Sequence, residues 1–335
     1  MTIIYAIIMF CLLIFIHELG HFMTAKACGV KVNEFALGMG PAIFKKQKGE
    51  TLYALRAIPI GGYCAMEGED EESEDARAFN NKPAWKKAII VVAGAAMNLI
   101  LCILFLIIIA LYTGTVTTTI DQVTAGSPAE AAGIQSGDKI VAVDQKKTDD
   151  WASLVTAIGT AKEEVTLEVE RDGQNLTLTS ELTEAEDGRM VIGIVPVREH
   201  NVLTAIKDGT VNTWNMTKMM VDTFRQLFTG DVSVKELSGP VGIVYAVNDT
   251  AQYGFVYLLY LTALISLNLA IVNMLPLPAL DGGRLLFIIV RKITGKAITD
   301  EMEGKVHFIG IMLLFALMIY VTWNDIVRFI VPIFN

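Results

Sequence analysis

The sequence predicts a polytopic α-helical membrane protein with four transmembrane helices, a membrane-associated β-hairpin loop and one extracytoplasmic α+β domain. Hydrophobic side chains make up 53% of the 335 residues, and the mean hydropathy is positive, which is too apolar for an ordinary soluble protein. Four apolar runs approach the ~20 residues that a helix needs to cross a bilayer. Between the second and third runs, short alternating stretches indicate strands and helices of a separate domain.

The first transmembrane helix is expected within residues 1–28, because residues 1–16 contain no charged side chain. This run could instead be a secretory signal peptide. It lacks a basic leading region and small residues at a cleavage site, however. The transmembrane interpretation is therefore preferred.

Three further apolar runs place the other transmembrane helices. The ranges expected for them are 88–113, 252–283 and 306–335, with a cytoplasmic loop at 284–305. Four crossings put both ends of the chain on one side of the membrane. Residues 26–87, which follow the first crossing and so lie on the opposite side, carry ten Lys and Arg, and this identifies their side as the cytoplasm.

The segment 29–87 is expected to form a cytoplasmic-side β-hairpin loop that re-enters the membrane, followed by an acidic linker. Residues 35–68 mix glycines with β-branched and aromatic residues in short alternating pieces, a pattern typical of strands. The acidic run 69–77 is interpreted as a solvated loop.

The domain at 114–200 begins with the motif "SPAEAAGIQSGDKI". Pro128 can open a short helix and Gly133 can end it. A strand, a second helix, a hairpin and a closing strand are expected to follow at 139–144, 150–161, 164–182 and 190–197. This order of elements resembles a PDZ domain of bacterial membrane and periplasmic proteases.

Charge and cysteine content exclude some functions of the external part. The net charge is −9, and residues 114–254 contain 21 Asp and Glu against 11 Lys and Arg, which argues against binding of nucleic acid. Cys11, Cys28, Cys64 and Cys102 all lie outside this segment, so a disulfide framework is excluded there.

An amphipathic helix is expected in the connecting segment 201–251. Apolar residues recur at helical spacing over 202–228. Such a helix can lie on the membrane surface or pack on its own domain, and the sequence leaves both possibilities open.

The motif "HELGH" stands near the end of the first apolar run. On a helix, His17 and His21 project from one face, with Glu18 beside them. Two imidazoles can bind zinc, which lowers the pKa of water towards ~7, and Glu18 can take its proton. Ionisable groups within a membrane cost at least ~2.5 kcal/mol each at its centre, which favours a functional site over a chance match.

Asp281, in "NMLPLPALDGGRL", is the candidate for a third zinc ligand. An ordinary Asp-Gly turn is the alternative. The third predicted helix runs inward like the first, however, and brings Asp281 to the same membrane face as the histidines. Pro276 and Pro278 interrupt the helix before it, and irregular backbone at membrane depth is tolerated where it lines a site. The other histidines, His200 and His307, lack ligand spacing and are interpreted as structural.

With these two motifs and the interposed PDZ-like domain, the chain resembles the bacterial site-2 proteases, zinc intramembrane proteases that include the regulator of sigma-E protease. The resemblance implies Zn²⁺ held by His17, His21 and Asp281, with Glu18 as the catalytic base. It also implies a membrane-reentrant hairpin at 35–68. Several members carry two tandem PDZ domains, whereas this chain has room for one.

The same resemblance implies a set of substrate-binding residues. "GAAMN", with Gly94 and Asn98, matches the family's Gly-any-any-any-Asn motif in the second helix. The expected substrate-binding residues are Asn98, Asn268, Asn273, Tyr53 and Leu55, the last two in a strand that pairs with unwound substrate.

The function implied is regulated intramembrane proteolysis: hydrolysis of single-span transmembrane substrates, such as anti-sigma factors or signal-peptide remnants, after another protease has trimmed them. The expected partners are these substrates and membrane lipid, without nucleic acid or a small-molecule cofactor. The expected location is the bacterial cytoplasmic membrane, with the active site toward the cytoplasm. Two alternatives are a proteolytically silent scaffold that binds peptides through its PDZ-like domain and a transporter or metal-handling protein.

Overall fold

The structure is a computed structural model that describes residues 2–69, 73–161, 163–185, 188–233, 237–295 and 300–333. Part of the acidic run 69–77 therefore lies outside the described residues. The chain forms two compact units. One comprises Met1–Leu106 and Gly209–Asn335, and the other comprises Ile107–Asp208.

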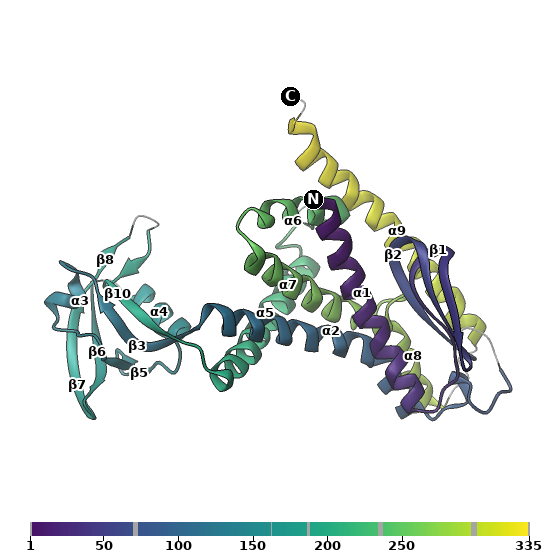
Figure 1. Ribbon diagram of the computed structural model, residues 1–335, viewed down its shortest axis with the longest axis horizontal. Coiled ribbons are helices and arrows are strands. Elements are labelled where there is room, and N and C mark those ends of the chain that lie inside the picture. The colour runs from purple at the N-terminus through teal and green to yellow at the C-terminus, as the bar shows by residue number, and fades with distance from the viewer. Residues whose placement is uncertain are drawn as a thin grey trace. The chain divides into compact units, whose positions relative to one another are not determined.

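Four helices among the described residues are long and apolar enough to cross a membrane (Figure 1). They are α1 (Thr2–Ala27), α2 (Ala84–Thr113), α7 (Phe255–Asn273) and α9 (Asp300–Asp325), the last continued by short helical turns at Ile326–Ile330 and Val331–Ile333. Large apolar side chains on them, such as Ile3 and Leu313, are more than half exposed. Exposure of this extent suits contact with lipid rather than water, and the predicted fold class is confirmed in these helices.

Two helices were not expected from the sequence. The segment 284–305, expected to be a loop, contains most of α8 (Asp281–Thr294), and the connecting segment contains α6 (Pro240–Ala251) after the expected α5 (Val202–Thr229). The third membrane helix, α7, ends at Asn273, before Pro276 and Pro278, which were expected to interrupt it. Trp214 and Met219 of α5 are 63% and 69% exposed, so neither side chain packs into a protein core.

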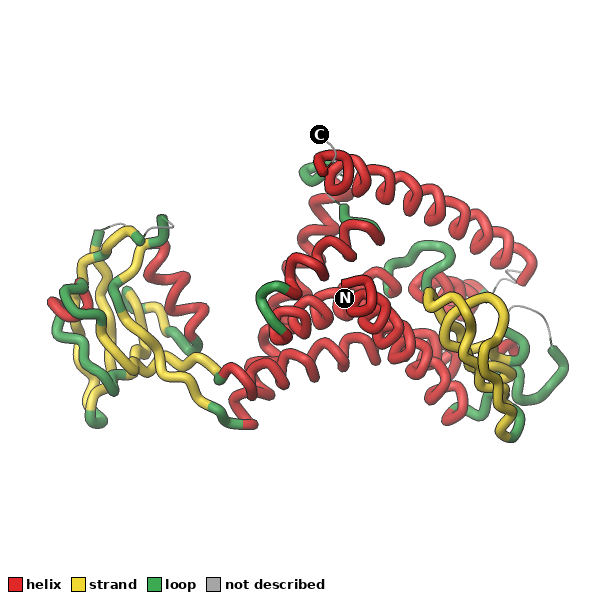
Figure 2. The backbone as a smooth tube through the Cα atoms, turned by 45° about the horizontal axis from the view of Figure 1, so that its top comes forward, coloured by secondary structure: helices red, strands yellow, loops and turns green. Residues whose placement is uncertain are grey.

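The expected hairpin consists of β1 (Val32–Lys48) and β2 (Thr51–Met66), which curl back on themselves (Figure 2). Residues 32–37 of β1 pair with two parts of β2, near 62–66 and near 52–55. Residues 44–48 of β1 pair with 51–55. The order across this sheet is therefore 62–66, 32–37, 52–55 and 44–48, which places 62–66 at an edge and Tyr53 and Leu55 inside.

The second unit is a β-rich domain with two helices on a sheet of strand order β10-β3-β4-β6-β7, in which β5 also pairs with β4. Its elements are β3 (Thr115–Val123), α3 (Pro128–Ala131), β4 (Lys139–Val143), β5 (Lys146–Lys147), α4 (Trp151–Thr160), β6 (Glu164–Arg171), β7 (Gln174–Glu181), β8 (Thr183–Glu184), β9 (Met190–Val191) and β10 (Ile194–Glu199). The helix–strand–helix–hairpin order matches the prediction. The strand β3 was not predicted, because its threonines are polar and hide the alternation of apolar residues. Threonine is nevertheless β-branched, and β-branched residues favour strands.

The ends of this domain lie side by side. In the pairing of β10 with β3, Glu199 stands opposite Thr115. The chain therefore enters and leaves the domain at one place, about 5 Å apart as in any antiparallel pair. The core of the domain is formed by fully buried residues that include Ile120, Leu154 and Leu167.

Candidate metal centre

His17, His21 and Asp281 come together in the first unit, as the sequence predicted. The Nε2 atoms of the two histidines lie 3.2 Å apart. Asp281 Oδ2 lies 3.3 Å from His17 Nε2 and 3.4 Å from His21 Nε2. The three potential ligand atoms thus form a nearly equilateral triangle.

This triangle fits a zinc ion. Tetrahedral ligands at ~2.0–2.1 Å from zinc are about 3.3 Å from one another. Asp281 Oδ2 is buried and lacks a hydrogen-bond partner of ordinary geometry among the described residues, as expected of an oxygen that a cation would contact. Two imidazoles and one carboxylate are also a donor set that zinc takes in hydrolases.

Local structure explains how the ligands are presented. The helix α1 carries both histidines one turn apart, with their rings edge-to-face at 4.8 Å between centroids. Asp281 is the first residue of α8, directly after the break that follows α7. The break allows the carboxylate to point at the helix α1 instead of continuing along α7.

The helix α2 holds both imidazole rings from behind. His21 Nδ1 lies 2.9 Å from the carbonyl oxygen of Ile90, so Nδ1 carries the proton and Nε2 keeps its lone pair for a metal. His17 Nδ1 lies 3.5 Å from the side-chain amide of Asn98. The amide oxygen and nitrogen are interchangeable by a flip, and the flipped amide would accept the proton of His17 Nδ1.

Gly94 lies against the same two rings. A Cβ at this position would lie 2.7 Å from His17 Cε1 and 2.8 Å from His17 Nε2, which is closer than non-bonded carbon and nitrogen atoms approach. Only glycine fits here. Gly94 and Asn98 stand four residues apart, so they share one face of α2 and contact neighbouring parts of the site.

A cavity of about 360 Å³ opens at the metal centre. It is lined by His17, Glu18, His21, Tyr63, Cys64, Ala65, Met66, Glu69, Val91, Asp281 and Arg284. The Glu18 carboxylate lies near the backbone N–H of Cys64. Glu18 and the edge segment 62–66 of the β-sheet therefore face the same space.

The residues predicted to bind substrate lie elsewhere. Asn98 is fully buried behind His17, whose ring it contacts, and it does not line the cavity. Tyr53 packs in an aromatic cluster with Phe22 and Phe35. None of the five predicted substrate-binding residues lines the cavity.

Asn268, Asn273 and Leu55 complete this set. Asn268 is exposed, Asn273 is half-buried and Leu55 is 46% exposed. Residues 63–66 are the part of the hairpin that lines the cavity at the metal centre, and they were not among the predicted site residues. The pair of glycines just before it, in "IPIGGYCAM", was the available signal for a close approach of backbone to α1.

The chain is similar to known proteins over almost its whole length. Residues 5–317 match the family described as "Peptidase family M50". A protein of Clostridium acetobutylicum is 39% identical over 331 residues, which cover 97% of each chain. The zinc metalloprotease RasP of Geobacillus kaustophilus is 33% identical, and the regulator of sigma-W protease RasP of Bacillus subtilis is 32% identical, each with 98% of both chains covered.

Among solved structures, the PDZ domain of the SdrC-like protein of Listeria innocua is similar to part of the chain. It covers 25% of this chain and 99% of its own, with 21% identity and a TM-score of 0.23.

Proposed function

This chain belongs to peptidase family M50, the bacterial site-2 proteases, and from this membership we propose that it hydrolyses peptide bonds within single-span transmembrane proteins. It is a zinc metalloprotease of a bacterial membrane. The observation that carries the proposal is the triangle of His17, His21 and Asp281 beside Glu18, in a cavity that a sheet edge lines.

We assign roles to the residues from this geometry. His17, His21 and Asp281 would hold the zinc, and their arrangement leaves one side open to the cavity. Zinc supplies Lewis acidity, which lets water lose a proton near neutral pH. Glu18 takes that proton and later passes it to the leaving amine. Asn98 and the Ile90 carbonyl keep the two imidazoles in the orientation that the ligands need.

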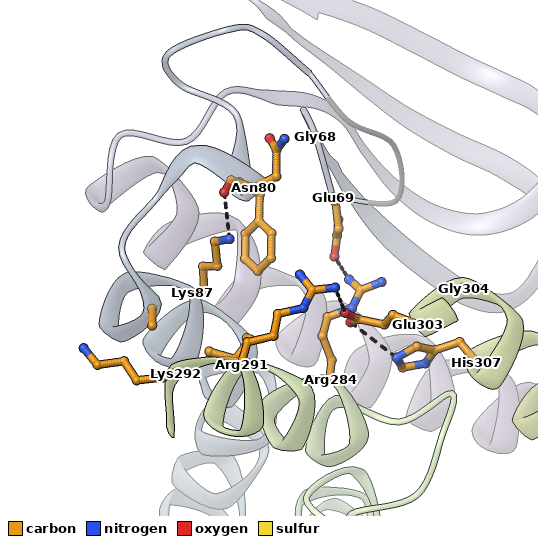
Figure 3. Close-up of a pocket in the computed structure, with 13 residues that line it drawn as sticks. Gly68, Glu69, Asn80, Lys87, Arg284, Arg291, Lys292, Glu303, Gly304 and His307 are labelled. Carbon is orange, nitrogen blue, oxygen red and sulfur yellow. Dashed lines mark hydrogen bonds and ion pairs between the residues drawn. The ribbon is translucent and has the colours of Figure 1, made fainter. Parts of the chain in front are cut away.

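The metal site is proposed to open toward the cytoplasmic half of the membrane. Lys26 lies in the last turn of α1, a few residues after His21. Lys87, Arg284 and Arg291 gather around a second cavity that shares Glu69 and Arg284 with the first (Figure 3). Basic side chains at helix ends are typical of the cytoplasmic face.

Substrate is proposed to bind at the edge segment 62–66, in place of Tyr53 and Leu55. A transmembrane helix must unwind before it is cut, and its freed backbone groups then need partners. In an antiparallel pair, alternate residues direct their backbone groups to the same side. Since the N–H of Cys64 points away from β1 to Glu18, the backbone groups of Gly62, Cys64 and Met66 are the ones that face the cavity. An extended peptide can add to such an edge.

Proline at these positions tests the strand addition. Met66→Pro removes an N–H that faces the cavity, where Glu69 Oε2 accepts a hydrogen bond from it, and leaves the pairing of β1 with Tyr63 and Ala65 in place. Cys64→Pro also removes the N–H next to the Glu18 carboxylate, so Met66→Pro is the decisive variant. We expect both variants to lose cleavage of a transmembrane substrate and to retain zinc. Cys64→Ala and Met66→Ala, which keep the N–H, should cleave normally.

Two results would count against the edge. Cleavage by the proline variants at the rate of the alanine variants would exclude strand addition at 62–66. The Leu55 side chain lies away from the cavity. Loss of cleavage in Leu55→Ala would indicate that substrate binds at residues 52–55 instead.

The PDZ-like domain is proposed to control access, so that substrates are cut after another protease has trimmed their external parts. The metal ligands all belong to the other compact unit, so among the described residues this domain contributes none of them. Recruitment of substrate tails is the competing role.

A deletion of residues 115–199 separates the two roles. Because Thr115 and Glu199 stand opposite each other, a short Gly-Ser linker can join Gly114 to His200. Control of access predicts that the deleted enzyme cuts a substrate that retains its external domain. Recruitment predicts instead that even the trimmed substrate is cut more slowly. Intact and deleted enzymes should be compared on one substrate with and without its external domain.

A further inference from the structure

Asp281 is presented by an irregular loop, residues 274–280, which we term the ligand loop. It contains Pro276 and Pro278, and Ala279 has a φ of +75°, in the left-handed region that non-glycine residues rarely adopt. A conformation of this kind persists when the surroundings hold it. The position of the third ligand therefore depends on whatever fixes the ligand loop.

One fixing contact comes from His307 in α9. The backbone N–H of Ala279 donates a hydrogen bond to His307 Nδ1 at 2.9 Å. A backbone N–H can only donate, so Nδ1 must hold a lone pair and the proton of the neutral ring is on Nε2. Ala279 is two residues before Asp281.

The His307 ring is itself held by neighbours on α8 and α9. Its Nε2 lies 3.7 Å from Glu303 Oε1, and Glu303 Oε2 accepts a hydrogen bond of 2.7 Å from Arg291. Figure 3 shows this chain of contacts, with the imidazole next to Glu303 and Glu303 next to the guanidinium. The ring also packs against Phe287, with 5.7 Å between centroids.

A second contact, independent of the first, comes from Gly310. A Cβ at Gly310 would lie 2.7 Å from both the carbonyl carbon and the carbonyl oxygen of Pro278. The helix α9 therefore touches the ligand loop backbone directly. His307 and Gly310 are three residues apart and share one face of α9.

From these contacts we propose that α9 positions the third metal ligand, with His307 and Gly310 holding the ligand loop so that Asp281 reaches the two histidines. This inference rests on the zinc site proposed above. His307 contacts the backbone of the ligand loop and not the reacting atoms, so it is a positioning residue. From the sequence, His307 was interpreted as structural because it lacks the spacing of a metal ligand. The proposed role is more specific than that interpretation.

A matched pair of variants tests the role of the acceptor. His307→Asn keeps an acceptor oxygen close to the position of Nδ1, whereas His307→Leu has nearly the same shape without any acceptor. The dissociation constant for zinc is measured on the full-length protein in detergent by competition with a chelator. We expect His307→Leu to bind zinc about 10- to 100-fold more weakly, the usual effect of removing a residue that orients a ligand, and His307→Asn to stay close to wild type.

Gly310→Ala provides a second test that leaves the imidazole unchanged. Its methyl group would collide with Pro278, so we expect weaker zinc binding. Gly304→Ala is the matched control in the same helix, because a Cβ there meets no atom within 4 Å. The visible spectrum of the cobalt-substituted protein gives a further readout, since a displaced carboxylate changes the ligand geometry.

The outcomes separate this inference from the zinc site itself. Wild-type zinc affinity in both His307→Leu and Gly310→Ala overturns the inference, as does equal weakening in His307→Asn and His307→Leu. Folding of His307→Leu is judged by thermal unfolding of the zinc-free protein. If this variant does not fold, the zinc affinities of Gly310→Ala and Gly304→Ala decide whether α9 positions Asp281. Asp281→Ala should weaken zinc binding whether or not α9 positions this residue. Unchanged zinc affinity in that variant would show that Asp281 is not a zinc ligand.

Discussion

Glu18→Gln is expected to abolish cleavage of a model transmembrane substrate and to leave zinc bound. The substitution removes the base and keeps the size of the side chain, and the ligand triangle of His17, His21 and Asp281 does not include Glu18. General-base catalysis contributes about 10²–10⁴-fold, so the residual rate should be lower by at least that factor. Zinc content and the rate of cleavage are measured on the same purified sample.

Asp281→Asn serves as the contrasting variant. A carboxylate ligand becomes a neutral amide, so zinc binding and cleavage should fall together. Near-normal turnover in Glu18→Gln with zinc bound would show that another group accepts the proton. A silent scaffold would show no cleavage even in the unmodified protein, and the experiment would expose that as well.

Gly94→Ala is expected to lose both zinc and activity, although neither residue type can bind a metal. The new methyl group would collide with both imidazole rings and push their Nε2 atoms out of the triangle. Overpacking of a close contact costs about 1–3 kcal/mol, which corresponds to roughly 5- to 150-fold in zinc affinity. The measurement is zinc affinity by chelator competition, followed by cleavage at saturating zinc.

Helix stability cannot explain such a loss. Alanine favours a helix over glycine by about 1 kcal/mol, so α2 itself should be no less stable in the variant. Gly304→Ala again gives the control for a glycine change in a membrane helix without a collision. Unchanged zinc affinity in Gly94→Ala would mean that the rings can move aside and that the fit around them is loose.

Some relatives are longer than this chain. The alignments with RasP of Geobacillus kaustophilus and of Bacillus subtilis span 413 and 415 positions, more than the 335 residues here, so those relatives contain additional residues. The relative from Clostridium acetobutylicum aligns over 331 residues. Any control of access in this chain must therefore operate with one PDZ-like domain, which the deletion of 115–199 can test directly.

The sequence by itself determined the features that depend on local spacing. Apolar runs of sufficient length identified four membrane helices, and the four-residue spacing of His17 and His21 placed two potential metal ligands on one face of α1. Both follow from helix geometry, which acts over a few residues. The order of elements in the PDZ-like domain was readable for the same reason, because turns and alternation are local signals.

Only the tertiary structure decided which distant residues meet. The curl of β1 and β2, which places residues 62–66 at the sheet edge and Tyr53 and Leu55 inside, arises because residues 32–37 pair with two separate parts of β2. The contact of Gly94 with both rings, the place of Asn98 behind His17, and the hydrogen bond from Ala279 to His307 all depend on how helices pack. Packing of this kind is set by side-chain shape across the interface between elements, and no spacing along one helix encodes it.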